Sequence, residues 1–223
     1  MKISIIIPVL NEAEKLSRIL GRLQVFRCQG HEVIVVDGGS TDDSLKFARE
    51  AADMVVESAP GRARQMNSGA AVATGNVYLF LHADTMLPDS ALQMISAVSN
   101  KQPCWGRFDV RLSGDRTVFR IIETMMNLRS RLTSVATGDQ AIFIDAGLFD
   151  SIGGYPEIAL MEDIAISRLL KKQQRAVCLT AKVTTSSRRW EAKGIVRTVL
   201  LMWKLRLYYF FGVSPEKLNQ LYR

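Results

Sequence analysis

Two side chains that could do chemistry, the imidazole of His82 and the carboxylate of Asp84, follow the apolar run Val77–Leu81. Such a run is typical of a buried strand in a parallel sheet. Because an unpaired carboxylate is costly to bury, we expect Asp84 at the strand end, facing water, a cation or a ligand. The structural alternative is a turn that Asp84 stabilises before Pro88.

Polar residues follow two other apolar runs in the same way, at Pro8–Glu12 and Asp37–Thr41. Ligands bind beyond the carboxyl ends of the strands in open parallel sheets, so all three segments are predicted to share one rim. Each has a structural alternative on its own, namely a helix cap at Asn11 or Ser40 and a turn at Asp37. Three such segments on one rim favour a binding site.

Several other site chemistries are excluded by the sequence. It contains no GxGxxG after a strand, no GxxxxGK[ST] and no GxSxG, and neither histidine has a partner at metal-ligand spacing. The three cysteines, Cys28, Cys104 and Cys178, include no CxxC pair, which argues against zinc and suits a reducing cytoplasm. Carboxylates remain, with Arg62 and Arg64 nearby, and this set suits a divalent cation shared with substrate phosphates.

The amino-terminal half must position these residues through alternating strands and helices. We expect strands at Ile3–Val9, Glu32–Val36, Met54–Val56 and Asn76–Leu81, and helices starting at Asn11 and Ser40 and spanning Arg62–Ala73. Asn11 and Ser40 each precede an acidic residue by three positions, which predicts capping boxes. The alternation predicts an α/β fold with a Rossmann-like, mainly parallel sheet flanked by helices.

The pattern changes after Asn100. We expect strands at Trp105–Leu112 and Gln140–Ile144, and helices at Thr117–Leu132 and Met161–Lys172. No Pro-, Gly- or Ser-rich linker separates two domains, and 223 residues are enough for one sizeable core. The short apolar amino terminus is predicted to be the first strand rather than a signal peptide.

The net charge of +7 lies entirely in residues 182–223, and residues 1–181 are balanced. An anionic partner is therefore to be sought at the carboxyl-terminal segment. Nucleic acid is not expected, because no recognition-helix pattern or basic sheet with interleaved aromatic residues accompanies the charge.

Seven segments in order carry a resemblance to a known family: PVLNE (8–12), VVDGGSTD (35–42), GRARQMNSG (61–69), HAD (82–84), GDQAIFI (138–144), MED (161–163) and SSRRW (186–190). Together they resemble the family-2 glycosyltransferases with the GT-A fold, in a small bacterial subgroup. The resemblance implies a catalytic domain at residues 1–192, with residues 1–100 for the nucleotide-sugar and 101–192 for the acceptor. A basic amphipathic helical segment at 193–223 follows.

The resemblance also implies a role for each matching residue. Asp163 would be the general base, and Asp84 would hold Mn²⁺ or Mg²⁺. The nucleotide-sugar would contact Pro8, Asn11, Glu12, Asp37, Arg64 and Asn67. The diphosphate and acceptor would lie near His82, Gly138, Asp139, Gln140, Glu162, Arg189 and Trp190. Without the family pattern, Glu162 and Asp163 would be attributed to the preference of acidic residues for helix starts.

The implied function is inverting transfer of a sugar from a nucleotide-diphospho-sugar to a hydroxyl acceptor that is lipid-linked or small. A carboxylate base and a charge-stabilised leaving group are what this reaction needs. Three residues depart from the family pattern: His82 replaces the first aspartate of DxD, Gly38 an acidic residue, and Ser186 the glutamine of QxxRW. A non-catalytic nucleotide- or sugar-binding module is therefore the alternative. Nucleotidyl transfer ranks lower, because it would need a glycine-rich loop and a basic residue after the first strand. The segment PVLNEAEKL there contains neither glycine nor arginine.

The apolar segment at residues 194–211 is interrupted by Arg197, Lys204 and Arg206, so it is not expected to span a membrane. A basic amphipathic helix can instead lie on an anionic membrane surface, which would place the protein on the inner face of the plasma membrane. Packing on the catalytic domain or on a dimer partner is an equal alternative, and Arg206 interrupts the apolar stripe.

Overall fold

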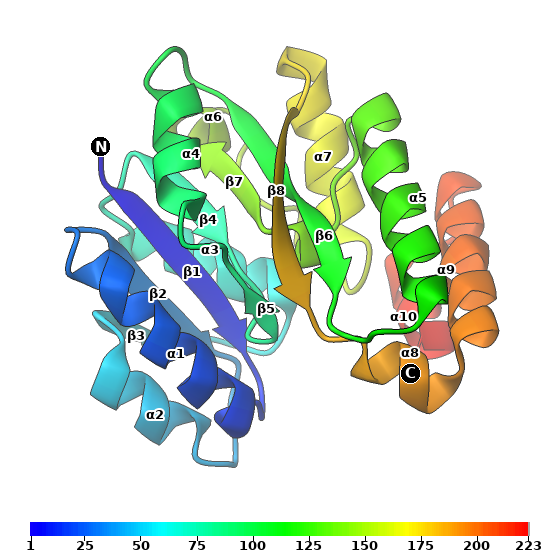
Figure 1. The fold of residues 1–223 in the computed structure, drawn as a ribbon, viewed down its shortest axis with the longest axis horizontal. Coiled ribbons are helices and arrows are strands. Elements are labelled where there is room, and N and C mark those ends of the chain that lie inside the picture. The colour runs from blue at the N-terminus through cyan, green and yellow to red at the C-terminus, as the bar shows by residue number, and fades with distance from the viewer. Residues whose placement is uncertain (223) are drawn as a thin grey trace.

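The computed structural model describes residues 1–222, except for the side chain of Arg189. One sheet has helices packed on its faces (Figure 1). The strands are β1 (Ile3–Val9), β2 (Glu32–Asp37), β3 (Met54–Glu57), β4 (Val77–Phe80), β5 (Thr85–Met86), β6 (Trp105–Leu112), β7 (Ile142–Asp145) and β8 (Val177–Thr185).

The helices are α1 (Ala13–Arg27), α2 (Ser44–Ala51), α3 (Arg62–Val72), α4 (Ala91–Ser99), α5 (Thr117–Thr133), α6 (Ala146–Ser151), α7 (Glu162–Gln173), α8 (Arg188–Lys193), α9 (Ile195–Phe210) and α10 (Pro215–Tyr222). A 3₁₀ turn spans Gly138–Gln140. In Figure 1, α8, α9 and α10 lie beside α5 at one side of the sheet.

The strand order is β3-β2-β1-β4-β7-β6-β8-β5. Strands β3, β2, β1 and β4 are parallel to one another, as are β6 and β8. Antiparallel pairing joins β7 to β4 and β6, and β5 to β8. The predicted α/β fold is confirmed, with a parallel half that carries the amino-terminal segments and a mixed half that follows it.

Most of the expected elements are present within two residues of their predicted bounds, and β1 and β6 match theirs. No strand is predicted from the sequence at β8, although this strand pairs with both β6 and β5. Its burial is uneven, with Thr180 and Lys182 exposed, so the apolar run that starts the strand does not extend along its length. Long-range pairing, not local pattern, determines this strand.

The predicted caps at Asn11 and Ser40 are wrong. Asn11 takes a left-handed conformation, with φ of 53°, and its Oδ1 accepts a hydrogen bond from Thr41 N at 2.8 Å. Ser40 Oγ accepts from Asn11 N at 2.9 Å, and Asp42 Oδ2 accepts from Ala13 N at 3.1 Å. The two loops after β1 and β2 therefore cap and brace each other, which fixes the shape of this part of the rim.

Strands β1 and β2 are buried on both sides, so apolar side chains pack on both faces of the sheet. Ile5 and Ile7 pack with α1 and α4 residues on one face, and Ile6 packs with α3 and α6 residues on the other. A β-carbon at Gly69 of α3 would lie 2.5 Å from Ile6 Cγ2. The close approach of α3 to the sheet thus requires glycine at this position.

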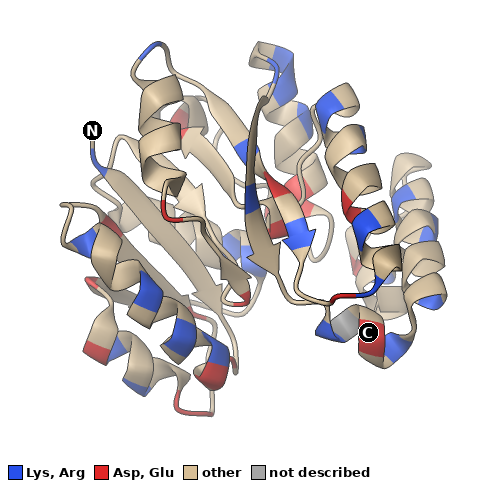
Figure 2. Ribbon diagram, in the orientation of Figure 1, with Lys and Arg blue, Asp and Glu red and all other residues tan. Residues whose placement is uncertain are grey.

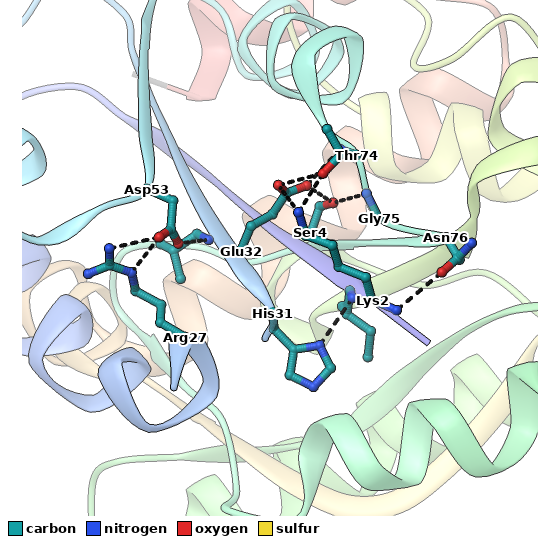
Figure 3. A network of polar contacts seen from close by, with 11 residues as sticks. Lys2, Ser4, Arg27, His31, Glu32, Asp53, Thr74, Gly75 and Asn76 are labelled. Atoms are coloured by element: carbon teal, nitrogen blue, oxygen red, sulfur yellow. Dashed lines mark hydrogen bonds and ion pairs between the residues drawn. The ribbon is translucent and has the colours of Figure 1, made fainter. Parts of the chain in front are cut away.

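A polar network ties together the strand ends that lie away from the rim (Figure 3). Glu32 accepts hydrogen bonds from Thr74 N at 2.7 Å and from Ser4 Oγ, and it pairs with Lys2 Nζ at 2.8 Å. Burial alone would raise the pKa of Glu32, but the bonds from Lys2, Ser4 and Thr74 outweigh it and lower the pKa to about 2. His31 Nδ1 accepts from Ile3 N at 3.1 Å in the same region, so this histidine is structural.

Candidate functional site

A cavity of about 480 Å³ opens at the carboxyl ends of β1 and β4, where the sequence places the polar rim. Of the predicted site residues, it is lined by Pro8, Glu12, His82, Asp84, Gly138, Asp139, Glu162, Asp163 and Trp190. Segments that are more than 150 residues apart in the chain thus meet around one space. The individual roles of these residues stay predictions.

Five predicted residues do not line the cavity and are engaged in other contacts, namely Asn11, Asp37, Arg64, Asn67 and Gln140. Asn11 braces the loop of Thr41, as described above. Arg64 Nε lies 3.4 Å from Glu157 Oε2, with both side chains about half exposed. Asn67 donates to Tyr155 O at 2.9 Å and accepts from Tyr155 N at 2.8 Å.

Gln140 is buried, and its Oε1 accepts from Thr137 N at 3.1 Å. Asn67 and Gln140 therefore hold loops of the site in place from outside the cavity. The side chain of Arg189 lies outside the described part of the chain.

The general base predicted from the sequence, Asp163, lies in the first turn of α7. The preceding Met161 has a left-handed conformation with φ of 71°, which turns the chain into the helix at the cavity wall. Asp163 Oδ1 accepts from Ile164 N at 2.7 Å, and Oδ2 accepts from Gly138 N at 3.2 Å. Two backbone donors from different segments thus fix the direction of this carboxylate.

The neighbouring Glu162 is buried, with Arg62 Nη1 4.0 Å from its Oε1. Burial raises the pKa of Glu162, and the charge of Asp163 raises it further. Burial lowers the pKa of Arg62, but the carboxylates of Glu162 and its neighbours outweigh this effect and raise it. A concentrated set of opposite charges at one wall is a common property of functional sites.

The imidazole predicted to replace a metal ligand, that of His82, is paired within the protein. Its Nδ1 lies 3.5 Å from Asp139 Oδ1. Burial would raise the pKa of Asp139, but the contact with His82 outweighs it and lowers the pKa. His82 therefore joins the end of β4 to the loop at residues 138–140, and its role toward a ligand stays a prediction.

Sequence reasoning missed Arg206 as a site residue. It was assigned as a charge that interrupts an apolar stripe, yet it lines the cavity from α9, as do Thr198 and Met202. Burial lowers the pKa of Arg206, and Asp163 and Asp139 offset part of that effect. The signal was its position, because residues 198, 202 and 206 recur at helical spacing on one face.

A second arginine, Arg129 of α5, lies within electrostatic range of Arg206. Burial and the charge of Arg206 lower the pKa of Arg129 to about 10. Its Nε and Nη2 are buried and have no hydrogen-bond partner within the described residues. Two guanidinium groups are thus held in poorly solvated positions beside the site, an arrangement that favours an anion nearby.

Asp37 carries one buried acceptor that the described chain does not satisfy. Its Oδ2 accepts from Gly39 N at 3.0 Å and from Ser40 N at 2.9 Å, while Oδ1 has no partner among the described residues. Unsatisfied buried hydrogen-bond acceptors are rare, so Oδ1 is suited to accept a hydrogen bond from a ligand.

The glycine that departs from the family pattern, Gly38, has a steric explanation. A β-carbon there would lie 2.9 Å from Gln65 Nε2, which donates to Val9 O at 2.8 Å and to Val36 O at 2.9 Å. Gln65 therefore occupies the space that a side chain at position 38 would need, and it ties together the ends of β1 and β2.

The donor set for a divalent cation is small. Asp84 lines the cavity, and Thr85 Oγ1 lies 3.5 Å from its Oδ1. Within residues 1–222, no three histidine, cysteine, aspartate or glutamate side chains gather in a way that could hold a metal ion. One carboxylate completed by substrate phosphates still fits Mg²⁺ or Mn²⁺, which keep few protein ligands in phosphate sites.

Comparisons with known proteins identify the family of this fold and site. Residues 4–134 match the family model described as glycosyl transferase family 2. The chain belongs to glycosyl transferase family 2. It is 32% identical over 164 residues to a PGL/p-HBAD biosynthesis glycosyltransferase of Mycobacterium bovis, a match that covers 68% of this chain and 62% of the relative. An uncharacterized glycosyltransferase of Nostoc sp. is 32% identical over 145 residues, covering 60% and 45%.

Solved structures of similar fold are glycosyltransferases of the GT-A type. S. aureus TarS 1-349 has a TM-score of 0.69 at 21% identity, covering 84% of this chain and 61% of that one. The mannosyltransferase PcManGT of Pyrobaculum calidifontis, solved with GDP-Man and Mn²⁺, has a TM-score of 0.67 at 20% identity, covering 98% and 67%. The predicted GT-A fold is confirmed. The chain spans about 62% of the length of the first relatives it matches.

Proposed function

We propose that this family-2 member is an inverting glycosyltransferase that moves a hexosyl group from a nucleotide-diphospho-sugar to a hydroxyl acceptor. The observation that carries the proposal is the position of Asp163, whose carboxylate is oriented by Gly138 N inside the cavity at the strand ends. A carboxylate fixed by backbone donors, and not consumed by an ion pair, suits a general base.

In the proposed reaction, Asp163 accepts the proton of the acceptor hydroxyl. The hydroxyl oxygen then forms a bond to the anomeric carbon from the face opposite the leaving group. The bond between the anomeric carbon and the diphosphate oxygen breaks, and the nucleoside diphosphate leaves with the electron pair. Inversion at the anomeric carbon follows from this single displacement.

The negative charge that develops on the diphosphate needs a positive environment. Arg62 and Arg206 line the cavity and supply part of it. Asp84 would hold a divalent cation together with the phosphate oxygens, and the bound cation would add positive charge at the leaving group. The PcManGT structure, which contains GDP-Man and Mn²⁺, supports this arrangement in a protein of similar fold.

The donor is proposed to enter beside β1 and β2. Pro8 and Glu12 line that side of the cavity, and the unsatisfied Oδ1 of Asp37 suits a donor group of the base. UDP-GlcNAc and GDP-Man, which are bound in the TarS and PcManGT structures, are the donors to test first. The three cysteines are free, which suits a reducing compartment such as the cytoplasm.

The substitution Asp163→Asn tests the proposal. It keeps the size of the side chain and an acceptor for Gly138 N but removes the base. We expect loss of sugar transfer by about a hundredfold or more, while nucleotide binding by calorimetry is retained. Asp150→Asn, on α6 and outside the cavity, is the matched control.

Equal transfer by wild type and Asp163→Asn would remove Asp163 as the base. A wild-type protein that binds nucleotide but transfers no sugar to any hydroxyl acceptor would support the alternative, a non-catalytic nucleotide- or sugar-binding module.

A further inference from the structure

Helix α5 presents an apolar stripe to solvent. Its members are Val118, Ile121, Met125, Leu128 and Leu132, between 37% and 68% exposed. Their spacing of three and four residues places them on one face of the helix. The opposite face of α5, with Phe119 and Ile122, packs on β6, so the exposed stripe is not needed for the core of the protein.

Helix α9 presents a second apolar stripe. Its members are Val196, Leu200, Trp203, Leu207 and Phe210, followed by Phe211, between 53% and 73% exposed. They also recur at three and four residues, on the face opposite Thr198 and Met202, which line the cavity. Helix α9 therefore has one face in the site and one apolar face in solvent.

The two stripes form one surface. Figure 1 shows α5 and α9 side by side, and Phe119 and Ile122 of α5 share an apolar cluster with Ile195 and Val199 of α9. Two adjacent apolar stripes make a contiguous exposed patch of the kind that marks an interaction site. We call the eleven exposed side chains of the two stripes the α5/α9 surface.

The charges on these two helices have one sign. Helix α9 contains no acidic residue, and the acid of α5, Glu123, is buried and paired with Arg120 at 2.9 Å. Arg197 and Lys204 are exposed on one flank of the α9 stripe, and Figure 2 shows the basic residues of both helices. A binding partner of this surface must therefore be apolar and anionic. A second copy of this chain is disfavoured, because it would bring two basic surfaces together.

We propose that the α5/α9 surface docks on an anionic lipid bilayer, with the apolar stripes of both helices inserted among the lipids. Apolar area in the bilayer and basic side chains near anionic headgroups together give interfacial binding of this kind. Lys204 lies 5.4 Å from the ring centroid of Tyr208, which places a cation beside an aromatic ring at the flank of the surface. No helix within the described residues has the length and the uninterrupted apolar sequence needed to cross the membrane.

The position of α9 links this surface to the site. A helix is about 10–12 Å across with its side chains, so the cavity face of α9 lies roughly that far from the docked face. An amphipathic acceptor held in the bilayer could then present its hydroxyl to Asp163 past Thr198 and Met202. This last step rests on the proposed function, whereas docking does not.

Vesicle flotation of the full chain tests the docking. The vesicles contain phosphatidylcholine alone or phosphatidylcholine with phosphatidylglycerol. The variants are Leu128→Glu on α5 and Trp203→Glu on α9, with side chains 54% and 57% exposed, and the control is Val25→Glu on α1, 51% exposed. Each substitution on the surface should lower binding to anionic vesicles about tenfold or more, and the control should not. Circular dichroism verifies that the exposed substitutions leave the fold intact.

Four outcomes would overturn the proposal. Equal binding to both vesicle types would remove the role of charge, and loss with Val25→Glu would mean unspecific adhesion. Loss with Trp203→Glu but not with Leu128→Glu would assign docking to the carboxyl-terminal segment alone. A dimer by light scattering that Leu128→Glu dissociates, without vesicle binding, would make the surface an interface between two copies. Flotation without any sugar transfer would leave docking in place and remove the proposed function.

Discussion

The ring of His82 packs so closely against Gly138 that a β-carbon at position 138 would lie 2.4 Å from both Cε1 and Nε2 of the imidazole. The same glycine donates its N–H to Asp163 Oδ2 at 3.2 Å. Gly138 thus couples the end of β4 to the proposed base, and its lack of a side chain is what permits both contacts.

The substitution Gly138→Ala should therefore disturb the site more than the fold. The added methyl group must displace His82, which breaks the contact with Asp139 and moves the donor of Asp163. We expect a loss in kcat/KM of about tenfold or more, and a decrease in the free energy of unfolding of about 1–3 kcal/mol. Steady-state transfer assays and urea denaturation measure the two effects.

Gly147→Ala is the matched control for this substitution. The nearest atom to a β-carbon at position 147 is Asp145 Oδ1 at 3.4 Å, an ordinary contact, and the position lies in α6. Activity close to wild type in Gly138→Ala would show that the position of His82 does not matter for transfer.

The substitution Arg206→Gln should lower activity while raising stability. Burial disfavours the charged form of Arg206 and lowers its pKa, and burial together with the charge of Arg206 lowers the pKa of Arg129. A residue held in such a place at the cavity wall is expected to serve the site at the expense of stability. We expect kcat/KM to fall about tenfold to a hundredfold and the midpoint of thermal unfolding to stay the same or rise.

Lys217→Gln, at an exposed position of α10, is the control for the removal of one positive charge. Arg206→Lys should recover part of the activity if charge is what the site needs. A large loss of stability in Arg206→Gln would instead make Arg206 a structural residue.

Local sequence patterns predicted the parallel half of the sheet because its strands are continuous apolar runs with clear turn signals. They could not predict β8, because the exposed Thr180 and Lys182 interrupt its strand pattern and the strand depends on long-range pairing. They also misassigned Asn11, whose amide oxygen bonds to Thr41 of another loop rather than to its own helix. Capping across loops depends on how two elements meet, and residue types do not encode that directly.

The site was predicted in part for the same reason. His82, Asp84 and Asp163 follow strand ends or start a helix, so their convergence could be inferred from topology and resemblance. Arg206, in contrast, lies more than 40 residues from Asp163 in the sequence. It belongs to a helix in which apolar residues dominate the sequence pattern. Its role at the cavity depends on how α9 packs on α7, and only the packed structure defines that arrangement.

Nucleotide binding should depend on a divalent cation through Asp84. A ligand at about 100 times its dissociation constant stabilises a fold by about 2.7 kcal/mol, which gives a readable shift in thermal unfolding. We expect UDP or GDP to stabilise the wild type more with Mn²⁺ than without, and Asp84→Asn to lose only the cation-dependent part. His82→Asp, which adds a second carboxylate, should strengthen the cation dependence.

Asp115→Asn, at an exposed position between β6 and α5, is the control. A cation-dependent shift of the same size in Asp84→Asn would move the cation away from this residue. A nucleotide shift that no cation alters would mean that Arg62 and Arg206 supply the positive charge themselves.

The acid sensitivity of the fold should depend strongly on Glu32, far from the cavity. The pKa of Glu32 is about 2 in the folded protein against 4.5 ordinarily. Because the folded-state pKa is lowered, the stabilisation is fully present above about pH 5 and is lost as the pH falls towards 2. With one pKa unit worth about 1.4 kcal/mol, and partial solvent access reducing the effect, we expect a loss of about 2–3 kcal/mol over this range.

The variant Glu32→Gln should be less stable than wild type at pH 7, because Lys2 loses its anionic partner in the network of Figure 3. The difference should shrink as the pH falls, since protonation removes the same charge from the wild type. Glu57→Gln, whose side chain is 69% exposed and pairs with Arg49 at 3.3 Å, is the control and should change little at either pH. Urea denaturation from pH 7 to pH 2.5 measures all three proteins. A constant gap between wild type and Glu32→Gln over that range would show that the charge of Glu32 does not contribute, because only an ionised Glu32 makes the gap depend on pH.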